Sequence, residues 1–340
     1  MLYPKQPDAY PKVYRKETDT LLPERPDNRL RYMYFKTITK GGTCIISSCK
    51  DLHLRRTICH KMLKPELAKN PVECARFLRE ARVTAMLQHP NTIPTYELGR
   101  DVKGNYYFTM KLVHGSTLRE IIDRCQKHNS HEVEGFDLFR LIDVISEACH
   151  ALHYAHIHGV VHRDMKPENI LVGEFGEVMV LDWGMAKVWD NDEMLAEIDQ
   201  AQQDFSYKSF NINDENLPLT QRSPLQGTPP YMSLEQLTHP SYVDYRTDIY
   251  SIGTLLFEVL ALERMIEGND VLTVIENIKK SVQISPSSRT PQLDIPEELE
   301  EVCLRCTHSD REKRYDSMED VIHALEAWMN PIRIDRPLEV

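Results

Sequence analysis

One stretch of the sequence carries most of its information: His162-Arg163-Asp164-Met165-Lys166-Pro167-Glu168-Asn169, followed after a short apolar strand by Asp182-Trp183-Gly184. An aspartate, a lysine two residues later, an asparagine and a second aspartate are set at short, definite offsets. A chance collection of solvated carboxylates does not account for this spacing. We therefore treat these side chains as one chemical set.

The set contains the groups that the transfer of a phosphoryl group requires. Such a transfer depends on positioning and on charge neutralisation more than on covalent chemistry by the protein. We expect Asp164 to face an attacking hydroxyl and Lys166 to reach the transferred phosphate from the same side of an extended loop. Asn169 and Asp182 offer oxygen ligands, which Mg²⁺ prefers, if two adjacent strands hold them together.

The same residues resemble the catalytic and metal-binding loops of the protein kinase superfamily. Two further phrases, Leu87-Gln88-His89-Pro90-Asn91 and Gly227-Thr228-Pro229-Pro230-Tyr231-Met232-Ser233, resemble bacterial serine/threonine kinases of the eukaryotic-like (Hanks) type. The similarity runs from about Tyr32 to Trp328. It implies an α+β, bilobal protein kinase fold, with a small N-terminal β-sheet lobe that carries one helix and a larger, mainly helical C-terminal lobe.

The order of local patterns agrees with that fold. Short runs of β-branched residues separated by turns extend over 34–63, helical spacing follows over 71–87, and helical patterns dominate after Gly115. We place the N-terminal lobe at 32–113 and the C-terminal lobe at 114–328. Residues 1–29 are proline-rich and predicted to be a poorly ordered tail, and 329–340 a C-terminal extension.

The composition restricts the partners and the compartment. The formal charge of −11 over 340 residues argues against nucleic acid and anionic membrane surfaces, and it is compatible with a basic protein substrate. The eight cysteines have no framework spacing and follow no signal peptide, which predicts a cytoplasmic protein. The longest apolar run, 249–262, is too short to cross a bilayer. We expect no membrane segment in this chain, which is either a stand-alone kinase or a fragment of a longer one.

The resemblance also implies a nucleotide site. A lysine at position 61 would contact the α- and β-phosphates of ATP and pair with Glu80. The glycine loop departs from the family: the three aligned positions are Thr39, Gly41 and Cys44, with Gly42 as an additional glycine. Glycine lets backbone amides approach a phosphate closely, so this departure leaves the rate of turnover open. The residues aligned with the nucleotide site are Ile38, Gly41, Gly42, Ile46, Cys59, Lys61, Glu80, Met110, Val113 and Leu171.

On the substrate side, Lys166 and Thr228 match serine/threonine rather than tyrosine kinases. By resemblance, Thr228 would hydrogen-bond Asp164 and Lys166 and hold the base toward the substrate hydroxyl. We further expect Glu235 to form a buried ion pair with Arg314. Trp183, which stands where a phenylalanine is commoner, should pack under the helix that carries Glu80.

The resemblance also suggests how the activity would be controlled. Asp248 matches a buried aspartate that braces the backbone around His162-Arg163, and Arg163 usually pairs with a phosphorylated residue. We therefore expect phosphorylation at Thr220 or Ser223. The acidic insertion at about 189–222 is either a disordered loop or a docking or autoinhibitory helix.

The sequence thus predicts a protein serine/threonine kinase that uses ATP and Mg²⁺, with Asp164, Lys166 and Thr228 as catalytic residues and Asn169 and Asp182 as metal ligands. Protein substrates, and the chain itself through autophosphorylation, are the expected partners. The alternative is a pseudokinase scaffold that binds nucleotide or a protein partner without turnover. A small-molecule kinase of the same fold is disfavoured, because 227–235 resembles a peptide-positioning segment.

Overall fold

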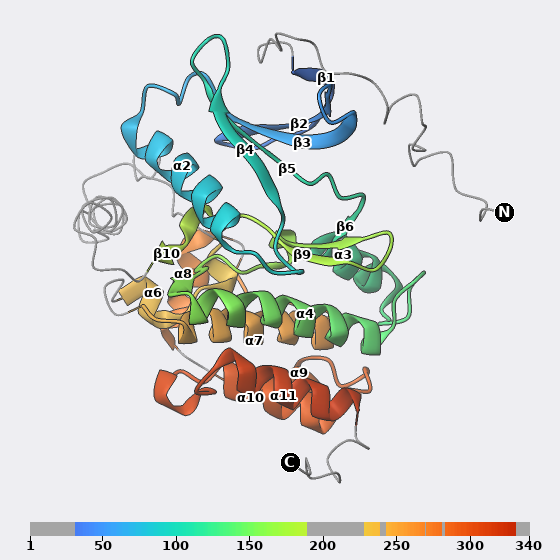
Figure 1. Cartoon of the computed structure of the whole chain (residues 1–340). Helices are drawn as coiled ribbons and strands as arrows, with labels where there is room; N and C mark the ends of the chain where they lie inside the picture. The colour runs from blue at the N-terminus through green and yellow to red at the C-terminus, as the bar shows by residue number, and fades with distance from the viewer. Residues whose placement is uncertain (1–30, 189–227, 239–242, 269, 281–282, 331–340) are drawn as a thin grey trace, which may run out of the picture. The chain divides into compact units, whose positions relative to one another are not determined.

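The computed structural model describes residues 31–188, 228–238, 243–268, 270–280 and 283–330 (Figure 1). Contacts divide the chain into two compact units. The first unit runs to Asn70 and includes Thr95–Leu112, and the second comprises Pro71–Pro94 and the residues from Val113 onward. The predicted tail, the activation-segment insertion with Thr220 and Ser223, and nearly all of the predicted C-terminal extension lie outside the described residues.

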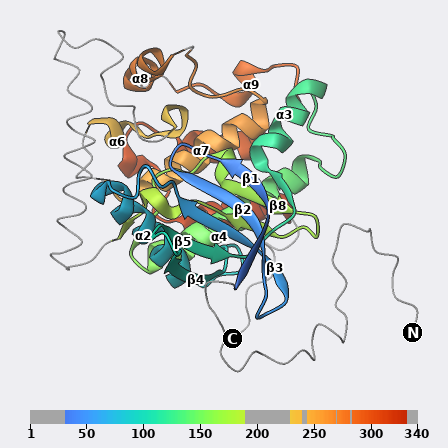
Figure 2. The ribbon, with the colours of Figure 1, turned by 90° about the horizontal axis from the view of Figure 1, so that it is seen from above.

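The first unit is built on a five-stranded antiparallel sheet, whose strands are seen from above in Figure 2. Its spatial order is β1-β2-β3-β5-β4. The bounds are β1 (Tyr32–Lys40), β2 (Cys44–Asp51), β3 (Arg56–Leu63), β4 (Thr95–Arg100) and β5 (Tyr106–Met110). A tight turn joins β4 to β5, in which Gly104 has φ +84° and the Asp101 N–H donates to the Asn105 carbonyl at 3.0 Å.

A polar cluster ties both edges of this sheet together. Arg31 donates to Asp51 Oδ2 at 3.0 Å and also contacts Glu97. The hydroxyls of Tyr32 and Tyr107 donate to Glu97 as well. Because Asp51 is only 1% exposed, its charge requires this arginine. The cluster thereby joins residues of β1, β2, β4 and β5.

The second unit is mainly helical. Its helices are α2 (Pro71–Met86), α3 (Leu118–His128), α4 (Leu138–Ile157), α6 (Leu234–Thr238), α7 (Arg246–Ala261), α8 (Val271–Lys280), α9 (Pro286–Arg289), α10 (Glu297–Cys306) and α11 (Met318–Met329). Short strands are β6 (Gly115–Thr117), β8 (Ile170–Gly173) and β9 (Val178–Val180) in one sheet, and β7 (Val160–Val161) paired with β10 (Lys187–Val188). Single 3₁₀ turns are η2 (Pro167–Asn169), η3 (Trp183–Met185), η5 (Pro229–Tyr231) and η7 (Arg311–Lys313).

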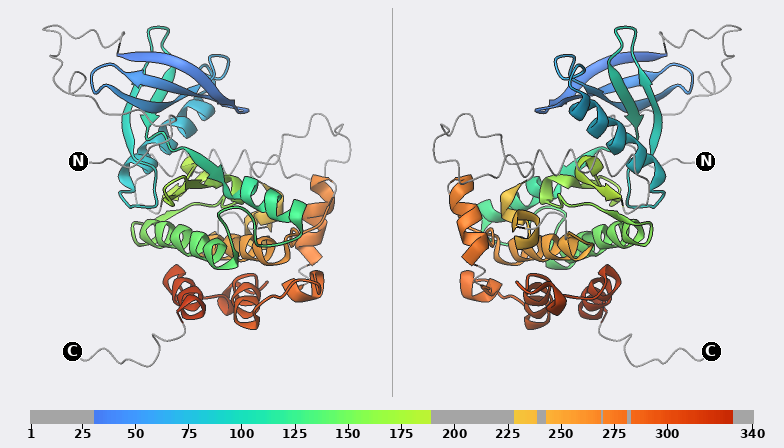
Figure 3. Two further views of the ribbon diagram at one scale, coloured as in Figure 1. Left: turned by 90° about the vertical axis from the view of Figure 1, so that its right-hand side faces the viewer. Right: turned by 90° about the vertical axis from the view of Figure 1, so that its left-hand side faces the viewer.

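Helix α7 is the centre of the second unit. Every residue from Thr247 to Ala261 is buried. Helices α4 and α10 pack against α7, and α11 packs against α4 and α10, so that the helices form layers (Figure 3). Local signals explain where the helices start: Asp137 caps α4 through the Arg140 amide, and Thr117 with Glu120 forms a capping box on α3.

The helices and strands lie in the ranges that the sequence patterns predict. One feature was not indicated by these local patterns, namely the compact unit to which α2 belongs. Helix α2 belongs by its contacts to the second unit, where it packs against η3. The predicted lobe boundary at residue 113 stays a prediction. Within the described part of the chain, no helix combines the length and apolar character that a membrane crossing requires.

The close packing of α7 on α10 gives a stability prediction. A Cβ atom at Gly253 would lie 2.5 Å from Cys306 Cβ and 2.7 Å from Thr307 Cγ2. Overpacking costs about 1–3 kcal/mol, whereas replacing a helical glycine by alanine gains about 0.5–1 kcal/mol. We therefore expect Gly253→Ala to lower the free energy of unfolding in urea by about 1–2 kcal/mol.

The matched control is Gly42→Ala, whose Cβ would meet nothing within 4 Å. This variant should unfold at nearly the urea concentration of the unmodified chain. A Gly253→Ala variant as stable as the control would contradict the proposed packing of α7 on α10.

Candidate active site

Asp248, at the start of α7, holds the backbone that leads into the catalytic loop. Its carboxylate accepts hydrogen bonds from the amides of His162 and Arg163, both at 2.8 Å. His156 Nε2 donates to the same carboxylate at 2.8 Å. Asp248 is fully buried, and Arg163 adopts a left-handed conformation with φ +67°. The predicted bracing role of Asp248 is confirmed.

The loop then brings the three predicted catalytic residues together. Lys166 Nζ donates to Asp164 Oδ2 at 2.8 Å and to Thr228 Oγ1 at 3.0 Å. The link between Thr228 and Asp164 therefore runs through the ammonium group of Lys166. The side chains of Asp164 and Lys166 are 10% and 18% exposed, so they are largely shielded but reachable.

Asn169 and Asp182 are held at the same end of a hairpin. Strands β8 and β9 pair with Ile170 opposite Val180, and the Leu181 amide donates to the Asn169 carbonyl at 2.8 Å. Asn169 Nδ2 donates to the Asp164 carbonyl at 2.7 Å, which leaves its Oδ1 as the atom that can ligate a metal. Asn169 directly precedes β8, and Asp182 follows β9 after Leu181, so the two paired strands place both residues at one end of the hairpin. Their role as metal ligands stays a prediction.

These two residues fit Mg²⁺ only together with ligands from a substrate. Among the described residues, no group of three or more His, Cys, Asp or Glu side chains is placed to hold a metal ion. Magnesium is commonly bound by one or two protein oxygens together with substrate phosphates. The amide oxygen of Asn169 and the carboxylate of Asp182 match this mode of binding.

Glu80 and Trp183 lie beside the second aspartate. A Cβ atom at Gly184 would lie 3.1 Å from Asp182 Oδ1 and 3.6 Å from Glu80 Oε2, so both carboxylates flank this glycine. Trp183 is fully buried, its ring centroid is 4.7 Å from that of His162, and its turn η3 packs against α2. The predicted packing of Trp183 against the helix of Glu80 agrees with these contacts.

The other predicted nucleotide residues are divided between the units. In the sheet, Ile46 pairs with Lys61 and Cys59 pairs with Met110, so these four residues share one face. Gly41 and Gly42 form the turn between β1 and β2, where the Gly41 amide donates to the Cys44 carbonyl at 3.0 Å. Ile38 lies at an irregularity of β1. Val113 and Leu171 belong to the second unit.

The segment after Thr228 is fixed by a buried ion pair. Arg314 donates to both oxygens of Glu235, at 2.6 and 3.1 Å, and the side chain of Arg314 is fully buried. This predicted pair is confirmed. Sequence reasoning missed Gln236, whose Nε2 donates to the Arg163 carbonyl at 2.8 Å and so connects α6 to the catalytic loop.

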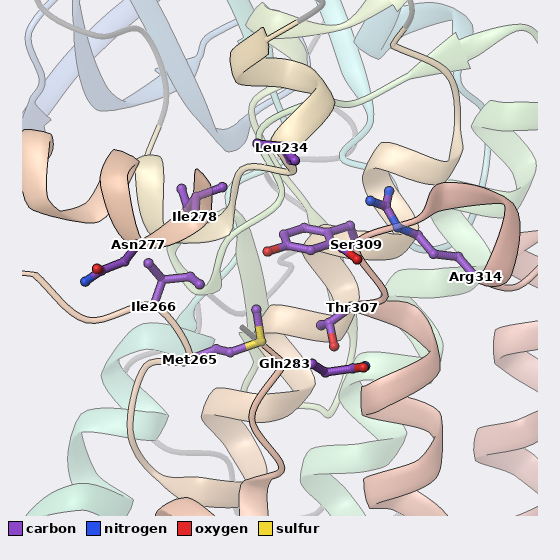
Figure 4. A pocket seen from close by; sticks show the side chains of 10 residues that line it. Leu234, Met265, Ile266, Asn277, Ile278, Gln283, Thr307, Ser309 and Arg314 are labelled. Atoms are coloured by element: carbon purple, nitrogen blue, oxygen red, sulfur yellow. The ribbon is translucent and has the colours of Figure 1, made fainter. Parts of the chain in front are cut away.

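A separate pocket opens beside this ion pair, with Leu234 of α6 and Arg314 among its lining residues (Figure 4). The remaining lining residues are Tyr250, Met265, Ile266, Asn277, Ile278, Gln283, Thr307 and Ser309. None of the predicted catalytic or metal-binding residues contributes to it. The pocket is therefore distinct from the candidate active site.

Comparisons with known proteins agree with this geometry. Residues 32–325 match the family model described as "Protein kinase domain", so the chain belongs to the protein kinase family. The chain is 33% identical to serine/threonine-protein kinase PknD of Protochlamydia amoebophila, over 93% of this chain and 31% of that protein. It is 30% identical to serine/threonine-protein kinase PknB of Mycolicibacterium smegmatis, over 84% of this chain and 41% of that protein. The predicted resemblance and fold class are confirmed, and the chain spans less than half the length of these relatives.

Removing one partner of the buried ion pair should destabilise the protein strongly. Arg314→Met leaves the Glu235 carboxylate, only 14% exposed, without its counter-ion. An uncompensated buried charge costs about 3–5 kcal/mol. We expect a loss of that size in the free energy of unfolding measured with urea.

The control is Glu312→Gln, which breaks the exposed pair between Arg246 and Glu312. Exposed pairs contribute at most about 1 kcal/mol. If Arg314→Met and Glu312→Gln lowered the free energy of unfolding by similar amounts, the ion pair between Arg314 and Glu235 would not be a major source of stability.

Two buried carboxylates should make the protein sensitive to acid. Burial acts to raise the pKa of Asp248, but the hydrogen bond and charge of His156 and the Arg163 amide hold this pKa below its ordinary value. Burial also acts to raise the pKa of Glu235, but the hydrogen bond and the positive charge of Arg314 outweigh this effect. The pKa of Glu235 therefore lies below its ordinary value as well. Their stabilisation is complete above the unfolded-state pKa of about 4 and is lost as the pH falls through the lower folded-state values.

We therefore expect the free energy of unfolding to fall steeply on acidification below about pH 4. Urea titrations at a series of pH values would measure this slope. Asp248→Asn should be less stable at pH 7 and show a shallower acid slope than the unmodified chain. An unchanged slope would exclude Asp248 as a contributor.

Proposed function

We propose that this chain is a protein serine/threonine kinase that transfers the γ-phosphate of ATP to protein hydroxyls. The observation that carries the proposal is the hydrogen-bonded series from Asp164 through Lys166 to Thr228, with Asn169 attached to the Asp164 carbonyl. A carboxylate and an ammonium group are thereby held in one geometry before any substrate binds. Such preorganisation is the main contribution a protein makes to phosphoryl transfer.

Each residue of this series has a defined task. Asp164 orients the substrate hydroxyl and accepts its proton as the bond to phosphorus forms. Lys166 offsets the negative charge that develops on the transferred group. Thr228 fixes the Lys166 ammonium from the opposite side, and thereby links the catalytic loop to the segment expected to hold a peptide.

ATP and Mg²⁺ are the proposed cofactors. Asn169 Oδ1 and the Asp182 carboxylate would hold the metal, which supplies charge neutralisation between the phosphates when bound. Lys61, with Glu80 as its partner, would anchor the α- and β-phosphates. Gly41 and Gly42 would cover them. The adenine contacts would come from Ile38, Ile46, Cys59, Met110, Val113 and Leu171.

The proposed substrates are proteins that present serine or threonine, and the chain itself is one candidate. Thr228 and Lys166 support the hydroxyl preference, and the net charge of −11 is compatible with basic proteins. The proposed lobes are 32–113 and 114–328.

The decisive experiment measures transfer of labelled phosphate from ATP to a generic basic protein and to the chain itself. Asp164→Asn and Asp182→Asn should each reduce the rate at least about 100-fold, because one removes the acceptor of the hydroxyl proton and the other a metal ligand. Lys61→Met and chelation of Mg²⁺ should also abolish transfer.

The matched control is Asp143→Asn, which affects only a half-exposed surface pair with Arg140 and should retain full activity. The pseudokinase scaffold makes the opposite prediction. If the unmodified chain transfers no phosphate, and if Asp164→Asn and Lys61→Met still bind a protein partner, the kinase proposal is wrong and the scaffold hypothesis is supported.

A further inference from the structure

The pocket that Leu234 lines lies close to the segment after Thr228 (Figure 4). Helix α8 forms one wall of this pocket and packs against both η5 and α6. Helix α6 contributes Leu234 to the pocket, while Gln236 of the same helix donates to the Arg163 carbonyl at 2.8 Å. The pocket and the catalytic loop therefore meet on one short helix.

The walls of the pocket are largely apolar and carry no unbalanced charge. Four lining residues have aliphatic or thioether side chains, namely Leu234, Met265, Ile266 and Ile278. Arg314 is the one charged residue among the described lining residues, and both oxygens of Glu235 accept hydrogen bonds from it. Because a charged occupant would lose hydration without gaining a counter-ion, we expect an uncharged one.

One hydroxyl group inside the pocket is open to an occupant. Tyr250, from α7, is only 6% exposed and lines the pocket. In the part of the chain that the structure describes, its hydroxyl meets no hydrogen-bond partner in the protein, yet its oxygen is not sealed off from solvent. Burial raises the pKa of Tyr250, so the hydroxyl is neutral and can donate. Since the polar groups of buried residues are normally hydrogen-bonded, this hydroxyl favours an occupant that carries an acceptor.

Hydrogen bonds within the protein hold the mouth of the pocket in shape. Asn277 Nδ2, on α8, donates to the Glu267 carbonyl at 2.9 Å. Arg289 donates to the Met265 carbonyl at 3.3 Å. Both bonds fix the segment that follows α7 and supplies part of the lining. The pocket is thus formed before anything enters it, which lowers the entropic cost of binding.

The size of the pocket favours a single side chain over a larger ligand. The cavity volume is about 30 Å³. This is more than one water molecule requires, but it holds only a group of a few heavy atoms. The first turn of α8 also presents Val271 and Leu272, which are 47% and 43% exposed. Apolar side chains left exposed on the helix that forms the wall favour a protein as the partner.

We propose that this pocket is a docking site for an uncharged, mainly apolar side chain of a protein substrate. The Tyr250 hydroxyl donates to a peptide carbonyl next to that side chain. The docked segment runs from the residues near Thr228 across η5 to α8, so it lies outside the region where phosphate is transferred. The identity of the partner as a substrate rests on the proposed kinase function, whereas binding to the pocket can be measured without activity.

NMR of the chain labelled at its methionine methyl groups measures binding directly, because Met265 lines the pocket. The probe is N-acetyl-leucine-N-methylamide, which has one aliphatic side chain and two peptide carbonyls, and N-acetyl-alanine-N-methylamide is its control. We expect the leucine probe alone to give a saturable shift of the Met265 signal, which is identified with Met265→Leu. No shift, or equal shifts with both probes, would refute the docking site.

A pair of tyrosine variants tests the hydroxyl. Tyr250→Phe removes only an oxygen that has no partner in the described protein, so the variant should fold normally. We expect it to bind the leucine probe about 3- to 10-fold more weakly, because one hydrogen bond is lost. Tyr154→Phe, on α4 and away from the pocket, should bind as the unmodified chain does. Equal affinities of Tyr250→Phe and Tyr154→Phe would contradict the role given to the Tyr250 hydroxyl.

A second pair of variants tests docking of substrate. Ser309 is an exposed lining residue, so Ser309→Trp should close the pocket without disturbing the core; Ser288→Trp is the matched control outside it. For transfer to a basic protein, we expect Ser309→Trp to raise KM about 10- to 100-fold with kcat unchanged, since one apolar side chain is no longer buried. A short peptide with the same phosphorylated serine should show no change.

Three results would separate the possible failures. An unchanged KM for the protein in Ser309→Trp would refute substrate docking. Light scattering that shows a dimer of the unmodified chain, made monomeric by Ser309→Trp, would identify a second copy as the occupant and overturn the proposed substrate. If the unmodified chain transfers no phosphate, the kinase proposal fails, and the NMR titration still decides whether the pocket binds an apolar side chain.

Discussion

The fully buried carboxylate of Asp248 is the constraint on which the active site depends. It accepts the consecutive amides of His162 and Arg163, and so holds Arg163 in a left-handed conformation that costs a non-glycine residue about 1–2 kcal/mol. The next amide, that of Asp164, donates to His162 Nδ1, while His162 Nε2 bonds to the Leu181 carbonyl just before Asp182. The two aspartates of the site are thus oriented from a single anchor. Without it, the strained backbone at Arg163 would relax and Asp164 would lose its direction.

Asp248 can act as an anchor because α7, which carries it, is packed inside the second unit. The helix is buried along almost its whole length, and its polar residues point to separate parts of the site. Thr247 donates to Glu235, Ser251 donates to the Tyr231 carbonyl at 2.9 Å, and Glu258 receives Arg119 and the Tyr231 hydroxyl. One rigid helix therefore sets the catalytic loop and the segment after Thr228 relative to each other. These few buried polar contacts connect the hydrophobic core around α7 to the residues of the candidate active site.

The residues that sequence reasoning found are those whose relationships are local. Asp164, Lys166 and Asn169 are close in the chain, and one hairpin brings Asp182 beside them, so offsets alone indicated their proximity. Arg119 and Gln236 could not be found in this way, because Arg119 meets Tyr231 and Glu258 over separations of 112 and 139 residues, and Gln236 meets Arg163 over 73. In the sequence, a single arginine or glutamine carries no local pattern that distinguishes it from a solvated side chain. The assignment of α2 to the second unit was missed for a similar reason, since its packing on η3 depends on residues a hundred positions further on.

The division of residues between the two units bears on the incomplete glycine loop. Asp164, Lys166, Asn169, Asp182, Thr228 and Glu80 all belong to the second unit, whereas Lys61 and the glycines at 41 and 42 belong to the first unit. The groups proposed to act on the transferred phosphate are held by Asp248, Glu235 and Glu258, none of which depends on the turn between β1 and β2. An incomplete glycine loop would therefore weaken ATP binding without changing the alignment of Asp164 and Lys166. If the chain transfers phosphate as we propose, the departure at Thr39 and Cys44 should raise the ATP concentration required more than it slows the chemical step, because the two tasks are carried by separate parts of the fold.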